Sequence, residues 1–555
     1  MTEWWRGSVT YQVYPRSFQD DNGDGIGDLK GITRRLDHIA RLGVDAVWLS
    51  PVFTSPQADM GYDVSDYTDI DPLFGTLADF DDLIARAHDL RLRIIVDQVI
   101  SHCSDQHPFF RESRADRTNP KADWFVWADP QPDGSPPNNW LSVFGGSAWE
   151  WESGRRQYYL HNFLASQPDF NFHNPAVQDW LLETMRFWLD RGVDGFRLDT
   201  VNYYFHDALL RSNPALAREK TAPEINPYDM QDHLFSKSQP ENLPFLERLR
   251  RLTDGYDARA MVGEVGDGQR AIELMAAYTS GPHRLHMAYS FEFLGPEFTA
   301  QHFRSRIENF FRGAPNGWPC WAFSNHDVIR HATRWAEFGI ADAIPKLAAA
   351  MLLSFEGSVC LYQGEELGQI ETELAFDELT DPRGIRFWPG DKGRDGCRTP
   401  MTWDAGPNGG FTTARPWLPV KPPQHARNVA AQDGVPGSVL ETYRAILAFR
   451  RGCPALTLGK GRFFDLPEPV LAFTRSAPDQ VLACVFNLSD QPQDLRAVGL
   501  SAAIGPSEGA TLAGSTLSLA PGAFGWFPVG DAAAVSIQST RPTLAPLARG
   551  PGPAG

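Results

Sequence analysis

The chain alternates amphipathic helical segments with short apolar runs, and several of these runs end in an acidic residue. In residues 31–50, apolar side chains at helical spacing precede Gly43 and the run VDAVWLSP. The same order of helix and apolar run recurs at 79–97, 180–199 and 246–264. This alternation predicts parallel strands that are covered by helices.

Further strands are predicted at 8–14, 285–291, 319–324 and 357–362, which brings the count to eight. Eight parallel strands with helices between them predict an α/β fold, and a (β/α)8 or TIM barrel is the simplest arrangement. The active site of such a barrel lies at the C-terminal ends of its strands.

Two irregular segments interrupt the alternation. Residues 103–167, after the third strand, are rich in proline, asparagine, tryptophan and glycine and show no helical period. Because this segment is too long for a plain loop, we expect a small inserted domain over the mouth of the barrel. Residues 366–420, after the eighth strand, are similarly irregular.

The character of the chain changes after a last predicted helix at 437–451. Alternating apolar runs such as VLAFTRS and FGWFPVG predict an all-β module. The expected domains are the barrel (1–102 and 168–455), the inserted domain (103–167), a C-terminal β-sandwich (456–535) and a disordered tail (536–555).

Charge and composition exclude several kinds of partner. The chain has 51 Lys+Arg against 69 Asp+Glu, a net charge of -18, whereas nucleic acids and anionic membranes require a basic face. No stretch has the 18 or more apolar residues of a membrane span, and no signal peptide is visible. The six cysteines have no metal-like spacing, so we expect a reduced, cytoplasmic protein.

Four predicted strands end in polar strings. These strings are IIVDQVISH at 94–102, GFRLDTV at 195–201, MVGEV at 261–265 and FSNHD at 323–327. They contain the acids Asp97, Asp199, Glu264 and Asp327. Since the ends of parallel strands meet at one face of a barrel, we expect the four acids to converge on one pocket.

The spacing within these strings indicates how the acids could work. Arg197 and Asp199 lie two apart on a strand and share a face, so the guanidinium would keep Asp199 ionised and oriented as a nucleophile. The alternative is a structural ion pair. Glu264 has no cation nearby in the sequence and would hold a proton at neutral pH, unless it is a surface glutamate just past its strand.

Histidines accompany two of the strings. Two acids and a histidine suit a sugar site, and His326 directly precedes Asp327. His102 and His326 could instead bind a metal, but no histidine pair has metal-ligand spacing. We therefore expect neutral imidazoles that hydrogen-bond a substrate.

Together the four strings resemble the four sequence regions of the α-amylase family of retaining α-glycoside hydrolases. QPDFN at 167–171 is similar to the extra region of the oligo-1,6-glucosidase and α-glucosidase branch. The opening VTYQVYPRSFQDDNGDGIGDLKGI, MGYDVSDY at 60–67, PYDMQDHLFSKSQPEN at 227–242 and LYQGEELG at 361–368 also resemble that branch. The likeness runs from about residue 4 to about residue 460.

The resemblance implies a role for each matching residue. Asp199 would be the nucleophile, Glu264 the general acid/base and Asp327 the carboxylate that binds the 2- and 3-hydroxyls of the sugar. Arg197 would orient Asp199. The remaining implied substrate contacts are Asp59 with Arg398 at the non-reducing end, Tyr62 against the sugar ring, Asp97, His102 and His326 around the glucose, and Phe144 and Phe163 at the entrance, where core packing is the alternative.

The chemistry implied is a double displacement with retention, in which the two catalytic carboxyl groups lie about 5–5.5 Å apart. In this branch, valine after the nucleophile tends to accompany α-1,6 substrates and threonine or alanine α-1,4 ones. Since this chain has Thr200, we expect an exo-acting α-glucosidase for maltose-like disaccharides, acting as a monomer or homodimer. The long segment 203–245 is expected to form a lid that favours disaccharides over long chains.

Other activities stay open. A transglucosidase, an oligo-1,6-glucosidase or a sucrose-acting enzyme of the same family would use the same glucosyl-enzyme with another acceptor or donor. A non-enzymatic scaffold, as in transporter heavy chains built on this barrel, is disfavoured, because the chain has the full set of catalytic acids and no membrane span.

The string DDNGDGIGD at 20–28 is the one metal signal. Its oxygen donors have the spacing of the first half of a calcium loop and are Asp20, Asn22, Asp24, the carbonyl of Ile26 and Asp28. Gly31 stands where an EF-hand needs glutamate, and a turn that needs no ion is the alternative. We expect a structural Ca2+ or Mg2+ here and no organic cofactor.

Overall fold

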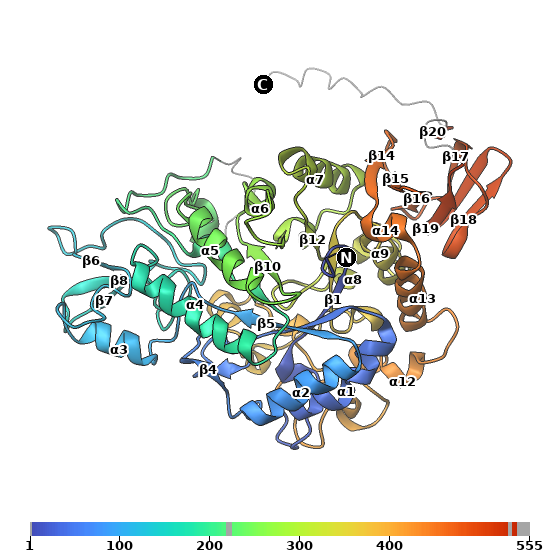
Figure 1. Ribbon diagram of the computed structural model, residues 1–555. Coiled ribbons are helices and arrows are strands. Elements are labelled where there is room, and N and C mark those ends of the chain that lie inside the picture. The colour runs from blue at the N-terminus through green and yellow to red at the C-terminus, as the bar shows by residue number, and fades with distance from the viewer. Residues whose placement is uncertain (1–2, 218–224, 531–534, 541–555) are drawn as a thin grey trace, which may run out of the picture.

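The computed structural model describes residues 3–217, 225–530 and 535–540 (Figure 1). Eight parallel strands form one sheet in the order β11-β10-β9-β5-β2-β1-β13-β12. They are β1 (Val9–Val13), β2 (Ala46–Leu49), β5 (Arg93–Gln98), β9 (Gly195–Leu198), β10 (Ala260–Val265), β11 (Met287–Ser290), β12 (Cys320–Trp321) and β13 (Ser358–Tyr362). A parallel bridge between Ala288 and Pro319 joins β11 to β12, so the predicted TIM barrel is confirmed.

Helices cover the outside of this barrel. They are α1 (Leu29–Leu42), α2 (Leu77–Asp89), α4 (Pro175–Asp190), α5 (Asn242–Asp254), α6 (Ala271–Thr279), α7 (Ala300–Gly313), α8 (His331–Arg334), α9 (Ile344–Leu352) and α13 (Val439–Arg451). Their ends follow local sequence signals: Asp28 caps the N-terminus of α1, and Gly43 ends it with a φ of 96°. The strands between them are buried, as their apolar sequences predict.

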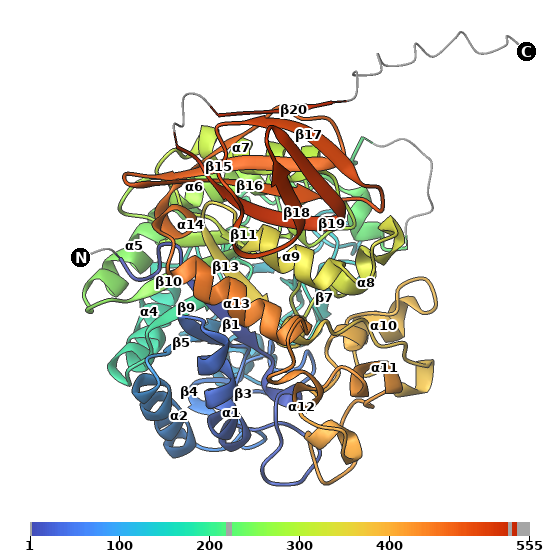
Figure 2. The same ribbon diagram turned by 90° about the vertical axis from the view of Figure 1, so that its right-hand side faces the viewer.

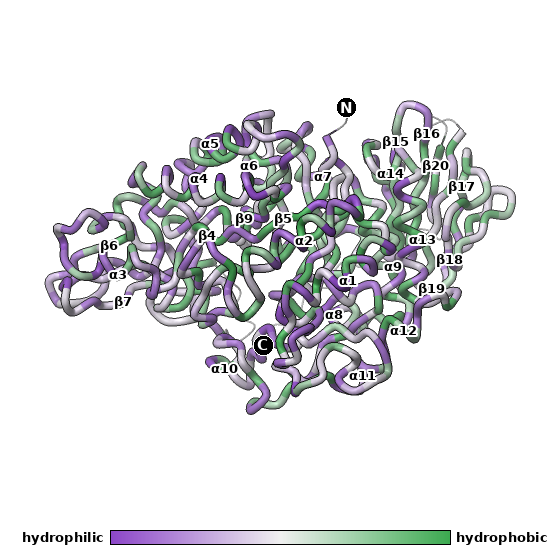
Figure 3. The backbone as a smooth tube through the Cα atoms, turned by 60° about the horizontal axis from the view of Figure 1, so that its bottom comes forward, coloured by the Kyte–Doolittle hydropathy of each residue, from purple (hydrophilic) through white to green (hydrophobic). Residues whose placement is uncertain are grey.

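The segment for which an inserted domain is expected lies between β5 and α4. It contains α3 (Pro108–Ala115) and a small antiparallel sheet of β6 (Trp127–Ala128), β8 (Gln157–Leu160) and β7 (Trp149–Glu152). Trp140 and Trp149 belong to a separate small core here. Figure 3 shows that this part projects from one end of the molecule.

The long segment after β13 has only short helices. They are α10 (Pro382–Phe387), α11 (Pro422–His425) and α12 (Val429–Gln432). A two-stranded ribbon of β3 (Phe53–Thr54) and β4 (Asp66–Ile70) follows β2. Asp59, in the turn of this ribbon, and the segment around α10 both contribute to the site described below.

The C-terminal part is an antiparallel all-β domain, as predicted, after α14 (Pro454–Leu458). Its strands are β14 (Lys460–Phe463), β15 (Val470–Ala477), β16 (Gln480–Asn487), β17 (Gln493–Val498), β18 (Ile504–Ala513), β19 (Thr516–Pro528) and β20 (Ser536–Ser539). It stacks on α9 and α13 (Figure 2), and Trp526 donates a hydrogen bond to Ser354 across this contact.

The predicted disordered tail was wrong at its start. Residues Ser536–Ser539 form β20, because the edge of β17 offers free backbone groups with which they pair. Residues 541–555 of that prediction lie outside the described residues. Among the described residues, no helix is long and apolar enough to cross a membrane.

Candidate active site

One buried arginine joins three of the four predicted acids. Arg197, on β9, has no solvent exposure, and its Nη1 lies 2.8 Å from Oδ1 of Asp97 and 2.6 Å from Oδ1 of Asp199. Its Nη2 contacts Glu264 on the neighbouring β10. The three carboxyl groups therefore converge at the C-terminal ends of adjacent strands, where the sequence places them.

The surroundings of Glu264 differ from the apolar strand end that was expected. Glu264 is 3% exposed and contacts both Arg197 and the hydroxyl of Tyr289. The difference arises from the barrel itself, because Arg197 and Tyr289 come from the strands on either side of β10. Tyr289 was not predicted as a site residue, because its strand carries no acid.

Asp97 lies behind Asp199 in the same network. Trp48 and Tyr62 donate hydrogen bonds to its Oδ2 at 3.1 and 3.0 Å. Burial raises the pKa of Asp97 above its usual range, although the charge of Arg197 opposes this shift. With Arg197 fixed between Asp97 and Asp199, the guanidinium is held rigidly against the predicted nucleophile.

His326 continues the network toward Asp327, whose Oδ2 lies 3.4 Å from its Nε2. The amide nitrogen of Gln12 lies 2.8 Å from Nδ1 of His326, and the hydroxyl of Tyr62 lies 2.6 Å from its Nε2. Burial lowers the pKa of His326 well below its usual value, so the ring is neutral. With Gln12 donating to Nδ1, the ring proton sits on Nε2 and is donated to Tyr62, whose own proton goes to Asp97.

Asp327 is the most accessible of the four acids, with a side chain that is 20% exposed. Burial disfavours its charged form, but neighbouring charges outweigh burial and lower its pKa. Those neighbours are His326, Arg394, Arg398 and Arg197. Since His326 is neutral, we attribute the lowered pKa to the three arginines.

Asp59 and Arg398, both predicted to bind the non-reducing end of the sugar, do not pair with each other directly. Asp59 pairs with Arg394 at 2.8 Å, whereas Arg398 donates to Asp327 at 3.1 Å and to the backbone carbonyl of His326. A 3-10 turn lies between the two arginines, and it places Arg394 rather than Arg398 over Asp59. Arg394 also binds Asp381 at 2.8 Å, and neither residue was predicted as part of the site.

Hydrogen bonds link Thr200 and, through Ser101, His102 to Oδ2 of Asp199, the oxygen that Nη1 of Arg197 does not contact. Ser101 Oγ lies 2.8 Å from Nδ1 of His102 and 3.1 Å from Oγ1 of Thr200, which is itself 3.1 Å from Oδ2 of Asp199. Thr200 has a φ of 38°, a left-handed conformation that is rare for a β-branched residue and occurs mainly at functional sites. Gln167, in the QPDFN string, donates to Asp59 at 3.1 Å.

The aromatic residues expected at the entrance lie next to these groups. The ring of Phe163 is 4.9 Å from that of His102, and Phe144 is 5.2 Å from the guanidinium of Arg394. Tyr62, expected to stack on a sugar, has its ring parallel to that of His326 at 5.2 Å. All the predicted substrate contacts thus fall around the four acids.

The loop predicted to bind a cation is closed by hydrogen bonds. Oδ1 and Oδ2 of Asp20 accept from the amides of Gly23 and Gly25, and Asp28 accepts from Asp21, Asn22 and Gly31. No group of three or more His, Cys, Asp or Glu side chains in the described part of the chain is arranged to hold a metal. Oδ1 of Asp20 and Oδ1 of Asp28 each accept one hydrogen bond and keep a second lone pair, and Asn22 and Asp24 are exposed, so the loop retains oxygen donors for a cation.

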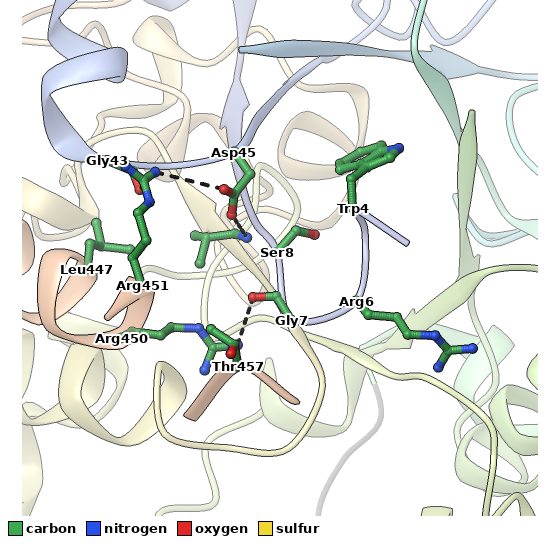
Figure 4. Close-up of a pocket in the computed structure, with 11 residues that line it drawn as sticks. Trp4, Arg6, Gly7, Ser8, Gly43, Asp45, Leu447, Arg450, Arg451 and Thr457 are labelled. Atoms are coloured by element: carbon green, nitrogen blue, oxygen red, sulfur yellow. Dashed lines mark hydrogen bonds and ion pairs between the residues drawn. The ribbon is translucent and has the colours of Figure 1, made fainter. Parts of the chain in front are cut away.

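A different cavity, of about 130 Å3, lies at the N-terminal end of β1 (Figure 4). Arg450 reaches it from α13 and donates to the carbonyl of Gly7, while Asp45 accepts from the amide of Val9. Since none of the four acids lines it, we attribute these contacts to the stability of the barrel floor.

The fold and the site define a class of enzyme. The barrel presents a carboxylate paired with arginine, a second buried carboxyl group and a third acid beside a neutral histidine. These groups suit the acid-base and nucleophilic chemistry that glycoside hydrolases perform.

Comparison with known proteins agrees with this class. The catalytic domain of α-amylase matches residues 12–459. A probable α-glucosidase of Rhizobium meliloti (strain 1021) is 59% identical over 496 residues, which cover 88% of this chain and 90% of that protein. An oligo-1,6-glucosidase of Heyndrickxia coagulans is 35% identical over 541 residues, covering 89% and 95%. The chain therefore belongs to the α-amylase family.

Solved structures give the same result. A crystal structure of an α-glucosyl transfer enzyme superposes with a TM-score of 0.91 at 52% sequence identity, covering 95% of this chain and all of that one. The trehalulose synthase of Pseudomonas mesoacidophila MX-45 superposes with a TM-score of 0.84 at 34% identity, with the same coverage.

Proposed function

We propose that this protein is a retaining, exo-acting α-glucosidase that releases α-glucose from the non-reducing end of short α-glucosides. The observation that carries the proposal is the contact of one guanidinium, that of Arg197, with both Asp199 and Glu264. This contact brings two carboxyl groups close together, which supports a double displacement in which Asp199 is the nucleophile and Glu264 the acid/base.

In the first step, Asp199 attacks the anomeric carbon while Glu264 protonates the glycosidic oxygen, so that the aglycone leaves and a glucosyl-enzyme forms. In the second step, Glu264 takes a proton from water, which attacks the anomeric carbon and releases Asp199. Two inversions give net retention. Arg197 orients Asp199 through the hydrogen bond between them, and Asp327 binds the 2- and 3-hydroxyls of the sugar.

The exo action is supported by Arg394, which spans the end of the site beyond the predicted glucose. It pairs with Asp59 from one loop and with Asp327 and Asp381, and Phe144 lies against its guanidinium. This cross-link would stop a chain from extending past its terminal sugar.

A preference for α-1,4 linkages is supported by Thr200. Its hydroxyl lies beside Asp199 and Ser101, so it makes the leaving-group side of the nucleophile polar. Among the relatives, maltase 1 of Drosophila virilis is 37% identical over 520 residues, which cover 89% of this chain and 79% of that protein.

A preference for disaccharides is supported by the contacts of segment 203–245, of which residues 218–224 lie outside the described part. Asn139 of the inserted segment donates to the carbonyl of Asn213 and accepts from its amide. Lys237 donates to Tyr203 and Tyr228 at 3.0 and 2.9 Å. These contacts hold the segment in place, which supports its role as a lid over the leaving-group side.

A second candidate is transfer of the glucosyl group to another acceptor. It is favoured by the 52% identity to an α-glucosyl transfer enzyme, since a glucosyl-enzyme reacts with any hydroxyl group that reaches it. We also propose a structural Ca2+ or Mg2+ in the loop of residues 20–28, held by Asp20, Asn22, Asp24, Asp28 and the carbonyl of Ile26, with no part in the chemistry.

A proton-NMR time course on equimolar maltose and isomaltose tests the proposal. Faster loss of maltose, with α-glucose appearing before mutarotation, is expected. Initial β-glucose would contradict retention, and faster loss of isomaltose would contradict the α-1,4 preference. Consumption of neither sugar would contradict the assignment to maltose-like substrates.

A further inference from the structure

Tyr289 links the two catalytic carboxyl groups through Arg197. It lies opposite Glu264 in the pairing of β10 with β11, and its ring is 6.2 Å from that of Trp48 inside the barrel. Its hydroxyl lies 2.9 Å from Nη2 and 3.2 Å from Nε of Arg197 and contacts Oε2 of Glu264. The side chain is buried, with 3% exposed.

The direction of these hydrogen bonds follows from the donors available. A guanidinium has N–H donors and no acceptor, so the Tyr289 oxygen must accept both bonds from Arg197. The single phenolic proton is then free for Glu264. Burial raises the pKa of Tyr289 well above its usual value, although Arg197 opposes this, so the hydroxyl stays a donor. Asp97 and Cys360 are the other ionisable groups that act on it.

Both partners of Glu264 meet the same oxygen. Arg197 and Tyr289 each contact Oε2, and both are donors. A proton carried by Glu264 is therefore disfavoured on Oε2 and favoured on Oε1, the oxygen that neither donor contacts.

We propose that Tyr289 is a positioning residue for the acid/base: it holds Oε2 of Glu264 and directs the transferable proton to Oε1, which faces the glycosidic oxygen. This inference rests on the proposed function, in which Glu264 protonates the leaving group. Because Arg197 binds Asp199 through Nη1 and Tyr289 through Nη2, the same guanidinium sets the position of both groups.

The test is the variant Tyr289→Phe assayed with two donors. Maltose needs a proton on its leaving group, whereas α-glucosyl fluoride releases fluoride with little help from an acid. Since kcat/KM reports the formation of the glucosyl-enzyme, its value for maltose should fall about tenfold or more relative to its value for the fluoride. A loss of equal size on both donors would show a merely structural role and overturn the inference.

Tyr11→Phe is the matched control. Tyr11 is fully buried on β1, and its hydroxyl donates to Oε1 of Glu366 at 2.7 Å, away from the four acids. This variant loses the same kind of hydrogen bond, so its thermal midpoint should fall while the ratio of the two kcat/KM values stays that of the wild type. A changed ratio in Tyr11→Phe would overturn the inference, because the ratio would then report general destabilisation.

Two further arms complete the experiment. Tyr289→Gln keeps a hydrogen-bond donor, so its ratio of kcat/KM for maltose to kcat/KM for the fluoride should lie between those of the wild type and Tyr289→Phe. If Tyr289→Phe does not fold, the ratio of Tyr289→Gln alone tests the inference. A wild-type ratio in Tyr289→Gln then overturns it. A wild type that turns over neither donor contradicts the proposed function and the inference with it. An active wild type whose ratio survives in both Tyr289 variants overturns the inference alone.

Discussion

Nη2 of Arg394 lies 2.8 Å from Oδ1 of Asp59, although 335 residues separate the two in the chain. The same guanidinium pairs with Asp381, which has no solvent exposure, and with Asp327. One side chain thus ties the turn after β3 and the irregular segment around α10 to the predicted sugar-binding acid.

Replacing this arginine should therefore damage both stability and binding. In Arg394→Met, the buried carboxylates of Asp59 and Asp381 lose their cation, which we expect to lower the free energy of unfolding by about 3–5 kcal/mol. Asp327 loses one of its two arginines, so KM for maltose should rise about tenfold or more. Denaturant unfolding and initial rates measure the two effects.

Arg383→Met is the control for that variant. Arg383 lies in the same segment and pairs with Asp391 at 2.7 Å, with side chains 38% and 22% exposed. A pair as accessible as this contributes about 1 kcal/mol or less. Losses of the same size in the two variants would contradict the importance of the Arg394 cluster.

Thr200→Val should shift the preference for linkage. The two side chains are nearly isosteric and both are β-branched, so the left-handed backbone at this position is equally strained in both. The variant loses the hydroxyl beside Asp199 and Ser101, and the ratio of kcat/KM for maltose to that for isomaltose should fall about tenfold, on the order of 1.4 kcal/mol. An unchanged ratio with a lower rate on both sugars would refute the role of the hydroxyl in linkage preference.

Glu365, in the 3-10 turn that follows β13, should make stability depend on pH. Burial raises the pKa of Glu365 to about 8, although the Tyr362 amide and Arg330 lower it. The charge of Glu366 also raises this pKa and that of Arg334 lowers it, and His331 lies 3.9 Å away. In the unfolded chain the pKa of a glutamate is about 4.3, so between that pH and about 8 only the folded protein holds the proton. The unfolding free energy then falls as pH rises through this window, by about 1.4 kcal/mol per pH unit from this residue.

Glu365→Gln, which mimics the protonated acid, should remove that slope. Its melting temperature relative to the wild type should therefore increase from pH 5 to pH 8. Glu508→Gln is the control, because the Glu508 side chain is 55% exposed in a surface pair with Lys346. If the difference between Glu365→Gln and the wild type were constant over this range, Glu365 would be ionised in the folded protein.

A cation in the loop of residues 20–28 should be visible as a change in stability. Removal of metal with a chelator should lower the melting temperature by several degrees, and added Ca2+ should restore it, because an ion that binds only the folded state stabilises it by mass action. Asp24→Asn should weaken this response without changing kcat. The alternative, a turn that needs no ion, would be favoured by two results together: a melting temperature that the chelator does not change, and no Ca2+ or Mg2+ in elemental analysis of the protein.

The sequence predicted those parts of the site that lie on regular strands. Asp97, Asp199 and Glu264 follow apolar runs, and the geometry of a parallel barrel then places them at one face. Arg197 and Asp199 could be paired because two residues on a strand share a side. Three of the acids could therefore be brought together without knowledge of any tertiary contact.

The remaining parts of the site and the fold depend on tertiary contacts that leave no periodic pattern in the sequence. Tyr289 reaches Glu264 only through the register of β10 and β11, and its strand has no polar end that marks it. Arg394 is placed by its contacts with Asp381, in a segment without helical or strand period, so its pairing with Asp59 was not predicted. The strand β20 was missed because its pairing with β17 is what orders it.

Trapping of the glucosyl-enzyme tests the central claim most directly. The protein is incubated with 5-fluoro-α-glucosyl fluoride, whose second fluorine slows both steps while the reactive leaving group allows the first. Mass spectrometry of the digested protein should then find one added fluoroglucosyl group on the peptide that contains Asp199, with no labelling of Asp199→Asn. A label on any other carboxylate, or turnover that gives β-glucose first and traps no adduct, would contradict the account.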